Sequence, residues 1–152
     1  MNGTRSFAAS LLWAVLILAT AVGACIKDEH EWTPEDLKSS AYYYSTQRDN
    51  REATRIINRA GEVFSVAERE KVIKLTDDAL ANAQKVHDSF LDKVHPQFKA
   101  HFRGEFQTGL ELARQNLAHP NSKTAHRAEE LFSAFVDWFN ANRDDIHMPP
   151  AY

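Results

Sequence analysis

Residues 65–94 decide the fold class, and they read SVAEREKVIKLTDDALANAQKVHDSFLDKV. Their apolar side chains recur at steps of three and four residues, which is the pattern of an amphipathic α-helix. Ser65 and Glu68 have the S-x-x-E spacing of a capping box, which pairs free N–H groups at a helix start. We therefore predict one long helix over residues 66–94. Its predicted buried face consists of Val72, Ile73, Thr76, Ala79, Leu80, Ala83, Val86, Phe90, Leu91 and Val94.

A second helix is predicted directly after the long one. Pro96 separates the two, because the residue before a proline avoids the α-helical region and a proline suits the first position of a new helix. Gly109 lies on the apolar face of this second helix, where it would let a neighbouring helix approach closely, whereas Gly104 lies off that face. The face consists of Phe98, Phe102, Phe106, Gly109, Leu110, Ala113 and Leu117.

Two further helical segments complete the pattern. After a turn with a capping residue at 119–122, a helix is predicted over residues 123–142. Its apolar face consists of Ala125, Ala128, Leu131, Phe132, Phe135, Val136 and Phe139. At the other end, residues 33–36 (TPED) place a cap, a proline and two acids where a helix N-terminus favours them. Because the polar run at 45–50 interrupts the apolar pattern, residues 34–64 form either one broken helix or two short ones.

Three long amphipathic helices joined by short turns pack antiparallel to one another. The sequence therefore predicts an all-α fold, an up-down bundle of about four amphipathic helices that follows a cleaved signal peptide. We expect this bundle to extend over residues 34–144 and a C-terminal tail to occupy residues 145–152.

The N-terminal segment has the three parts of a secretory signal. Arg5 and the N-terminal amine provide a positive start, residues 11–18 (LLWAVLIL) form an apolar centre, and small residues lead to Cys25. We therefore expect residues 1–24 to be a signal peptide and residues 25–33 to be a lipidated N-terminus with a short tether.

The residues before Cys25, which is the single cysteine of the chain, resemble the lipobox of bacterial lipoproteins. Val22, Gly23, Ala24 and Cys25 match its order of a branched apolar residue, two small residues and a cysteine. The resemblance implies cleavage between Ala24 and Cys25, diacylglycerol on the Cys25 sulfur and acylation of the new amine. Ile26 after the cysteine implies sorting to the outer membrane of a bacterial envelope, with the domain facing the periplasm. Several acyl chains together anchor a protein stably.

Two other interpretations of the leader stay open. The residues before Cys25 also fit an ordinary signal-peptidase site, which would release a soluble protein with a free thiol. The 21 uncharged residues at 6–26 are also long enough for a permanent membrane anchor. Lipidation explains the single cysteine best, because a free exposed thiol is a liability in an oxidising compartment.

The composition and the motifs exclude several function classes. The 18 basic and 21 acidic side chains give a formal charge of −3, without the clustered basic face that nucleic-acid binding needs. A single cysteine provides no disulfide framework within the chain. The sequence contains no Gly-rich phosphate loop, no G-x-S-x-G and no H-E-x-x-H motif, and no C-x-x-C-H haem motif. We therefore expect neither an enzyme nor a cofactor.

Seven histidines allow a metal-site hypothesis. The weak candidates, near the Pro96 turn, are His87, Asp92, His95 and His101. Asp92 and His95 are three residues apart and would share a helix face, whereas His101 and Glu105 have the spacing of an ordinary helix-surface pair. A di-iron bundle would need Glu-x-x-His motifs and inward carboxylates, which the apolar faces lack. A small-ligand or metal-binding bundle that uses these histidines is the alternative prediction.

Three consecutive tyrosines, Tyr42, Tyr43 and Tyr44, cannot all face one core from a helix. Tyr44 shares a face with Leu37 and Ala41, so we expect Tyr44 to pack inward and its neighbours to lie on the surface. Tyrosine is favoured in protein interfaces, which makes the three residues the candidate partner-binding site.

The sequence as a whole predicts a membrane-tethered envelope lipoprotein. We expect its helical domain to be a non-catalytic binding or accessory module for another envelope protein, with the lipid on Cys25 as the link to the membrane.

Overall fold

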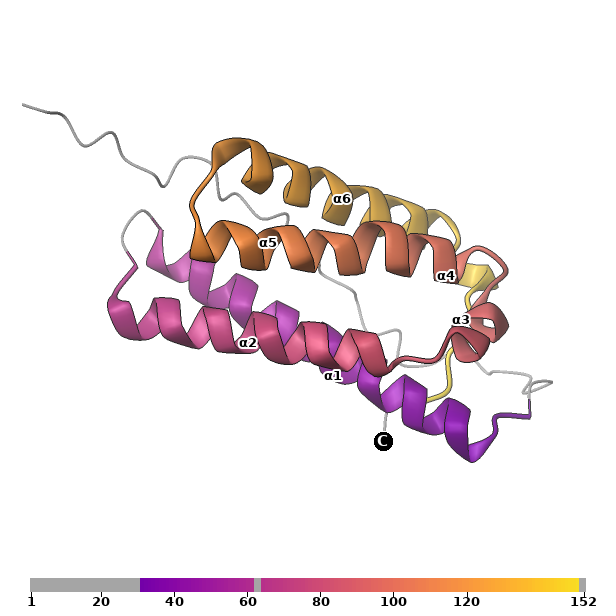
Figure 1. Ribbon diagram of the computed structural model, residues 1–152. Coiled ribbons are helices and arrows are strands. Elements are labelled where there is room, and N and C mark those ends of the chain that lie inside the picture. Colours follow the sequence, from indigo (N-terminus) through magenta and orange to yellow (C-terminus); the bar gives the residue numbers. More distant parts are fainter. Residues whose placement is uncertain (1–30, 62–63, 151–152) are drawn as a thin grey trace, which may run out of the picture.

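The computed structural model describes residues 31–61 and 64–150, and this part of the chain is all-helical, without strands (Figure 1). The predicted signal peptide, the lipobox and Cys25 lie outside the described residues. Within the described part, no helix combines the length and the apolar character that crossing a bilayer requires. The elements are α1 (Pro34–Ala60), α2 (Val66–Lys85), α3 (Asp88–Val94), α4 (Phe98–His101), the π-helix η1 (Phe102–Gln107), α5 (Thr108–Ala118), α6 (Ser122–Ala141) and the 3₁₀-helix η2 (Arg143–Asp145).

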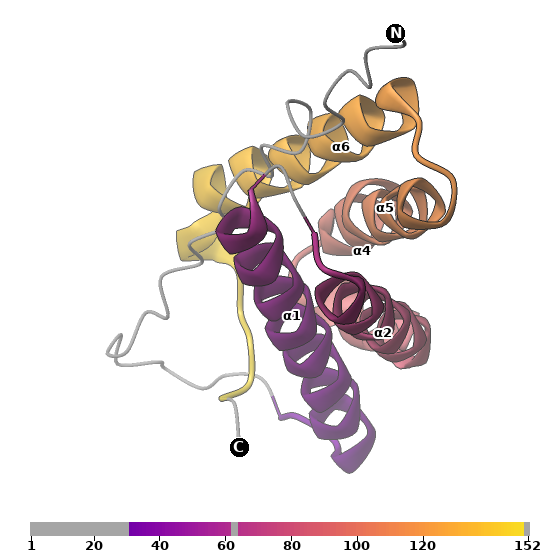
Figure 2. The same ribbon diagram turned by 90° about the vertical axis from the view of Figure 1, so that its left-hand side faces the viewer.

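The longest helices lie side by side in the order α1, α2, α5, α6. Close backbone contacts join α1 to α2, α2 to α5 and α5 to α6. Figure 1 shows that the helices of each of these pairs run in opposite directions. In the end-on view of Figure 2, α1 and α6 stand at the two ends of this curved series.

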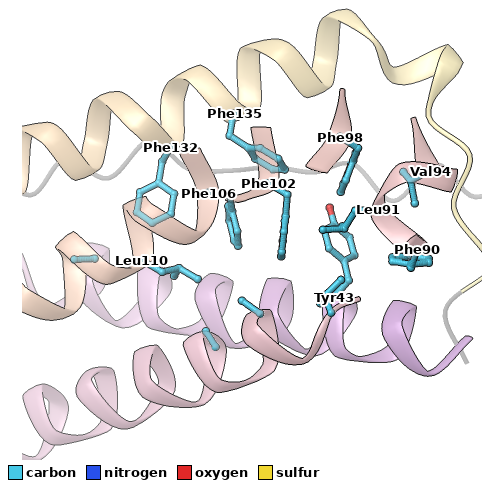
Figure 3. Close-up of a cluster of buried hydrophobic side chains, with 14 of the residues drawn as sticks. Tyr43, Phe90, Leu91, Val94, Phe98, Phe102, Phe106, Leu110, Phe132 and Phe135 are labelled. Carbon is cyan, nitrogen blue, oxygen red and sulfur yellow. The ribbon is translucent and has the colours of Figure 1, made fainter. Parts of the chain in front are cut away.

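The core between the helices is rich in phenylalanine. Figure 3 shows rings from the α4–η1 segment and from α6 pointing toward one another. The ring centroids of Phe106 and Phe135 are 5.1 Å apart, and Phe98 and Phe102 stack at 6.2 Å. Burying one such side chain stabilises a fold by about 1.5–3 kcal/mol. The apolar face predicted for the helix after Pro96 is buried throughout. The face predicted for the helix over residues 123–142 is buried too, except that Val136 and Phe139 are only partly buried.

Two local predictions for these helices are confirmed. A Cβ atom on Gly109 would lie 3.1 Å from the ring of Phe132, so the missing side chain does let α5 and α6 approach closely. The side chain of Asn121 accepts hydrogen bonds from the backbone N–H groups of Lys123 and Thr124, and thus caps α6.

The predicted single helix over residues 66–94 is wrong in its middle. Its capping box of Ser65 and Glu68 is present, but Val86 and His87 adopt extended backbone angles and divide it into α2 and α3. Arg103 donates to the carbonyls of Ala83 and Val86, which would otherwise accept hydrogen bonds within a continuous helix. The break therefore results from a tertiary contact that the local apolar pattern does not contain.

The segment at 34–64 also differs from the prediction, because α1 runs without a break from Pro34 to Ala60. Its start is as predicted, with a capping box between Thr33 and Asp36. The polar run at 45–50 continues the helix, and Thr46 within it is buried with hydrogen-bond partners. The Thr46 hydroxyl lies 2.9 Å from the Tyr42 carbonyl and 3.4 Å from the Ala79 carbonyl of α2.

The helix after Pro96 begins two residues later than predicted and contains a wider turn. Pro96 and Gln97 form a turn, and α4 starts at Phe98. The next six residues form the π-helix η1, in which the Thr108 hydroxyl donates to the Arg103 carbonyl five residues earlier. Single π-turns inside α-helices are frequent at functional sites, and this one positions Arg103.

Candidate functional site

The structure places the three candidate tyrosines on different surfaces of α1. Tyr43, and not Tyr44, packs inward: Tyr43 is 3% exposed, and its ring centroid lies 5.7 Å from those of Phe98 and Phe102. Tyr42 and Tyr44 are partly buried on either side. The expectation for Tyr44 was wrong because the core-facing side of α1 is the one that carries Tyr43, Ala53, Ile56 and Ile57.

The face predicted to be buried instead lines a groove on the outside of α1. The groove has a volume of about 310 Å³ and is lined by Leu37, Ser40, Ala41, Tyr44, Ser45 and Arg48. Ala41 and Arg48 are exposed, and the Arg48 guanidinium pairs with Asp49 at 3.0 Å. The groove is thus lined by apolar and hydroxyl side chains, with the Arg48–Asp49 ion pair at one end.

The segment after η2 is attached beside this groove. The Tyr44 hydroxyl donates a hydrogen bond of 2.9 Å to the Pro149 carbonyl, and the backbone N–H of His147 donates to the Val94 carbonyl at 3.0 Å. Ile146 and Met148 pack against the core between these two bonds. Burial raises the pKa of Tyr44 above its ordinary value, so its hydroxyl stays a donor at neutral pH.

Tyr42 lies on the side of α1 that faces α2. The Lys85 ammonium lies 5.5 Å from the centre of the Tyr42 ring, a cation–π contact worth about 0.5–1 kcal/mol at an exposed site. Tyr42 is therefore partly exposed next to a cation, whereas Tyr43 is almost fully buried.

The candidate metal ligands do not converge. The Nδ1 of His87 lies 3.7 Å from a carboxylate oxygen of Glu35, and Asp92 pairs with Lys99 at 2.8 Å. In the part of the chain that the structure describes, no group of three or more histidine, cysteine or acidic side chains has the geometry to hold a metal ion.

Two of the candidate histidines do meet, but around an aromatic ring. His101 stacks on Trp138 with 4.2 Å between centroids and 12° between planes, and His95 contacts the same ring edge-on at 5.4 Å. The Nδ1 of His101 lies 2.9 Å from Oε2 of Glu105. This arrangement joins the α3–α4 turn to the end of α6, and it provides a packing role for both histidines.

The sequence analysis did not assign three residues of the groove, Ser40, Ser45 and Arg48, to the face of Leu37, and it did not connect Trp138 with the histidines. Ser40 and Arg48 follow Leu37 at three and eleven residues, which is the spacing of one helix face, so this signal was present. Trp138 lies within a predicted helix, but nothing in its neighbourhood along the chain indicates the contact with His101.

Comparisons of the chain with models of known protein families, with curated proteins and with solved structures found no match. The functional assignment therefore depends on the residues themselves.

Proposed function

We propose that this chain is an envelope lipoprotein, tethered to the bacterial outer membrane through lipid on Cys25 and facing the periplasm. In this proposal, residues 34–144 form an up-down bundle of four long helices that acts as a non-catalytic binding module for another envelope protein. The outward groove on α1 is the observation that carries the binding role, because it leaves apolar side chains on a surface where a helix usually presents polar ones.

The groove suits a helical segment of the partner. Its floor follows one face of α1 from Leu37 to Arg48, so an apolar helix face can lie along it, as in other helix-in-groove complexes. Tyrosine and arginine are the residues that most often dominate binding energy at interfaces, and the Arg48 side chain is 73% exposed.

The position of the groove fits a tethered module. Its first residue, Leu37, lies one turn from the start of α1, next to the predicted tether at residues 25–33. Nine residues span at most about 30 Å when extended. A lipid on Cys25 would therefore hold this end of the domain near the membrane, within reach of a partner anchored in the same membrane.

The anchoring step is tested by metabolic labelling with radioactive palmitate. The wild-type chain should be labelled and processed, and Cys25→Ser should be unlabelled and accumulate as the precursor. If Cys25→Ser is labelled or matures normally, the lipid anchor is excluded.

The binding role is tested with a matched pair of exposed alanines. Ala41→Trp fills the groove, whereas Ala81→Trp adds the same side chain to the exposed face of α2. In affinity purification from solubilised envelopes, Ala41→Trp should lose a co-purifying protein that the wild type and Ala81→Trp retain. Equal recovery with both variants would mean that the groove does not bind the partner.

A further inference from the structure

Residues 146–150, which we call the strap, connect the end of the helical bundle with the outer groove. They have no regular secondary structure, and Figure 2 shows them running alongside α1. Ile146 and Met148 pack against the phenylalanine-rich core, Pro149 is fully buried, and His147 between them is exposed. The strap therefore covers part of the apolar surface beside the groove.

Hydrogen bonds join the strap to α3 and to α1. The backbone N–H of His147 donates to the Val94 carbonyl, and the Pro149 carbonyl accepts from the Tyr44 hydroxyl. Because a proline has no N–H group, the two prolines at the end of the strap cannot donate a backbone hydrogen bond. Single hydrogen bonds contribute little net stability, since water replaces them when they break. Burial of its apolar side chains therefore provides most of the attachment of the strap.

Tyr44 belongs both to the groove and to the attachment of the strap. It is one of the residues that line the groove, and its hydroxyl holds the Pro149 carbonyl at 2.9 Å. Its ring also packs edge-on against Tyr43, with 5.6 Å between centroids. A segment that enters the groove and moves the Tyr44 ring would therefore break the bond to the strap.

The groove is short for a protein interface. Its lining runs from Leu37 to Arg48, which is roughly 17 Å along a helix. A stable interface takes about 20–30 residues from each side, many more than the described residues that line the groove. A partner helix therefore needs additional surface, and the strap covers apolar surface directly beside Tyr44.

We propose that the strap is a displaceable cover of the binding site. The partner helix takes its place beside Tyr44, and release of the strap extends the groove over the part of the core that Ile146 and Met148 cover. This inference rests on the proposed function, because it assumes an envelope partner in the groove. A ligand shifts an equilibrium only when it binds one state better, and the released state offers the partner more apolar surface. The attached strap thus lowers the apparent affinity for the partner.

Met148→Asp loosens the strap without changing the groove, which Met148 does not line. In the purified chain, we expect the His147 amide to exchange its hydrogen at least about tenfold faster in this variant. Met148→Leu keeps an apolar side chain and should leave the exchange unchanged. Leu75→Asp places the same charge at a partly buried position of the other core cluster and should not accelerate exchange selectively at His147. Unchanged exchange in Met148→Asp would overturn the proposal, because Met148 would then not hold the strap.

The effect of the strap on binding is measured in living cells with a photoreactive amino acid at Ala41 in the groove. The yield of crosslinked partner per chain should rise at least about threefold in Met148→Asp, because more chains are open. It should stay at the wild-type level in Met148→Leu and in Leu75→Asp. If the wild type gives a product and Met148→Asp does not increase it, the strap proposal is overturned and the proposed function stands. No product from any of these chains would overturn the proposed function and the strap proposal with it.

Discussion

The guanidinium of Arg103 donates a hydrogen bond to the backbone carbonyl of Val86, at the point where the chain leaves helical geometry between α2 and α3. The same group donates to the Ala83 carbonyl at 2.8 Å and to a carboxylate oxygen of Asp88 at 2.9 Å. One side chain of the π-helix thus caps the end of α2 and holds the start of α3.

Replacing Arg103 should therefore destabilise the fold. Arg103→Leu leaves the Val86 carbonyl without the guanidinium donor and the Ala83 carbonyl with only the N–H of Val86, and it should lower the free energy of unfolding by about 2–4 kcal/mol. Arg103→Lys should recover less than half of this loss, because an ammonium lacks the planar set of donors that reaches Ala83, Val86, Asp88 and Gln107 together. Chemical denaturation measures both values.

Arg127 provides the control for this prediction. It pairs with Glu130 on the exposed surface of α6, where such pairs contribute about 0–1 kcal/mol. If Arg103→Leu costs no more than Arg127→Leu, the capping role of Arg103 is refuted.

The two helical glycines should respond in opposite directions to the same change. Gly109→Ala places a Cβ atom 3.1 Å from the Phe132 ring and should cost about 1–3 kcal/mol. Nothing lies within 4 Å of a Cβ atom on Gly104, so Gly104→Ala should stabilise by about 0.4–1 kcal/mol by restricting the unfolded chain. Thermal unfolding compares the variants, and a loss of stability in Gly104→Ala would show that its surroundings differ from those described.

Asp36 should make stability depend on pH. Burial alone raises the pKa of this carboxyl, but hydrogen bonds from Lys93 and Thr33 outweigh burial and hold the pKa below its ordinary value of 3.8. The contribution of Asp36 is therefore complete above about pH 4 and is lost as the pH falls through the lower pKa of the folded state.

The matching variant is Asp36→Asn. It should cost about 1–2 kcal/mol at pH 7, and its difference from the wild type should shrink toward zero near pH ~2. Denaturation curves at several pH values test this. A difference that stays constant with pH would mean that the carboxylate charge does not contribute.

The bond between Tyr44 and Pro149 should hold the C-terminal segment in place. Tyr44→Phe removes the hydroxyl donor and should cost about 0.5–1.5 kcal/mol. Hydrogen exchange of the His147 amide, which bonds to Val94 in the same segment, should accelerate more than exchange in α5. Equal acceleration in both places would indicate a global effect instead of release of the segment.

Several parts of the fold were predictable because their causes lie close together in the sequence. The capping box of Ser65 and Glu68 depends on residues one turn apart. The phenylalanine stripes follow from helix periodicity, and they predicted the core faces of α4 to α6. Gly109 was identified in the same way, from its position on such a face.

The errors occurred where contacts between distant residues outweigh local pattern. Arg103 caps the end of α2 although it lies 17 residues after Val86 in the sequence. Thr46 is buried with a hydrogen bond instead of interrupting α1. Both effects come from polar side chains that contact distant backbone carbonyls, which a count of apolar positions cannot detect. For the same reason the face of Leu37, Ala41 and Tyr44 was assigned to the core. The groove that these residues line was found only in the structure.

The most direct test of the proposed function is site-specific photocrosslinking in living cells of the organism that encodes the chain. A photoreactive amino acid replaces Ala41 in the groove or, as the control, Ala81 on α2. We predict a discrete crosslinked product from position 41, containing one envelope protein identified by mass spectrometry, and none from position 81. The product should disappear in Cys25→Ser, which would lack the proposed lipid anchor. No product from position 41, or the same products from both positions, would contradict the proposal that this groove presents the tethered domain to an envelope partner.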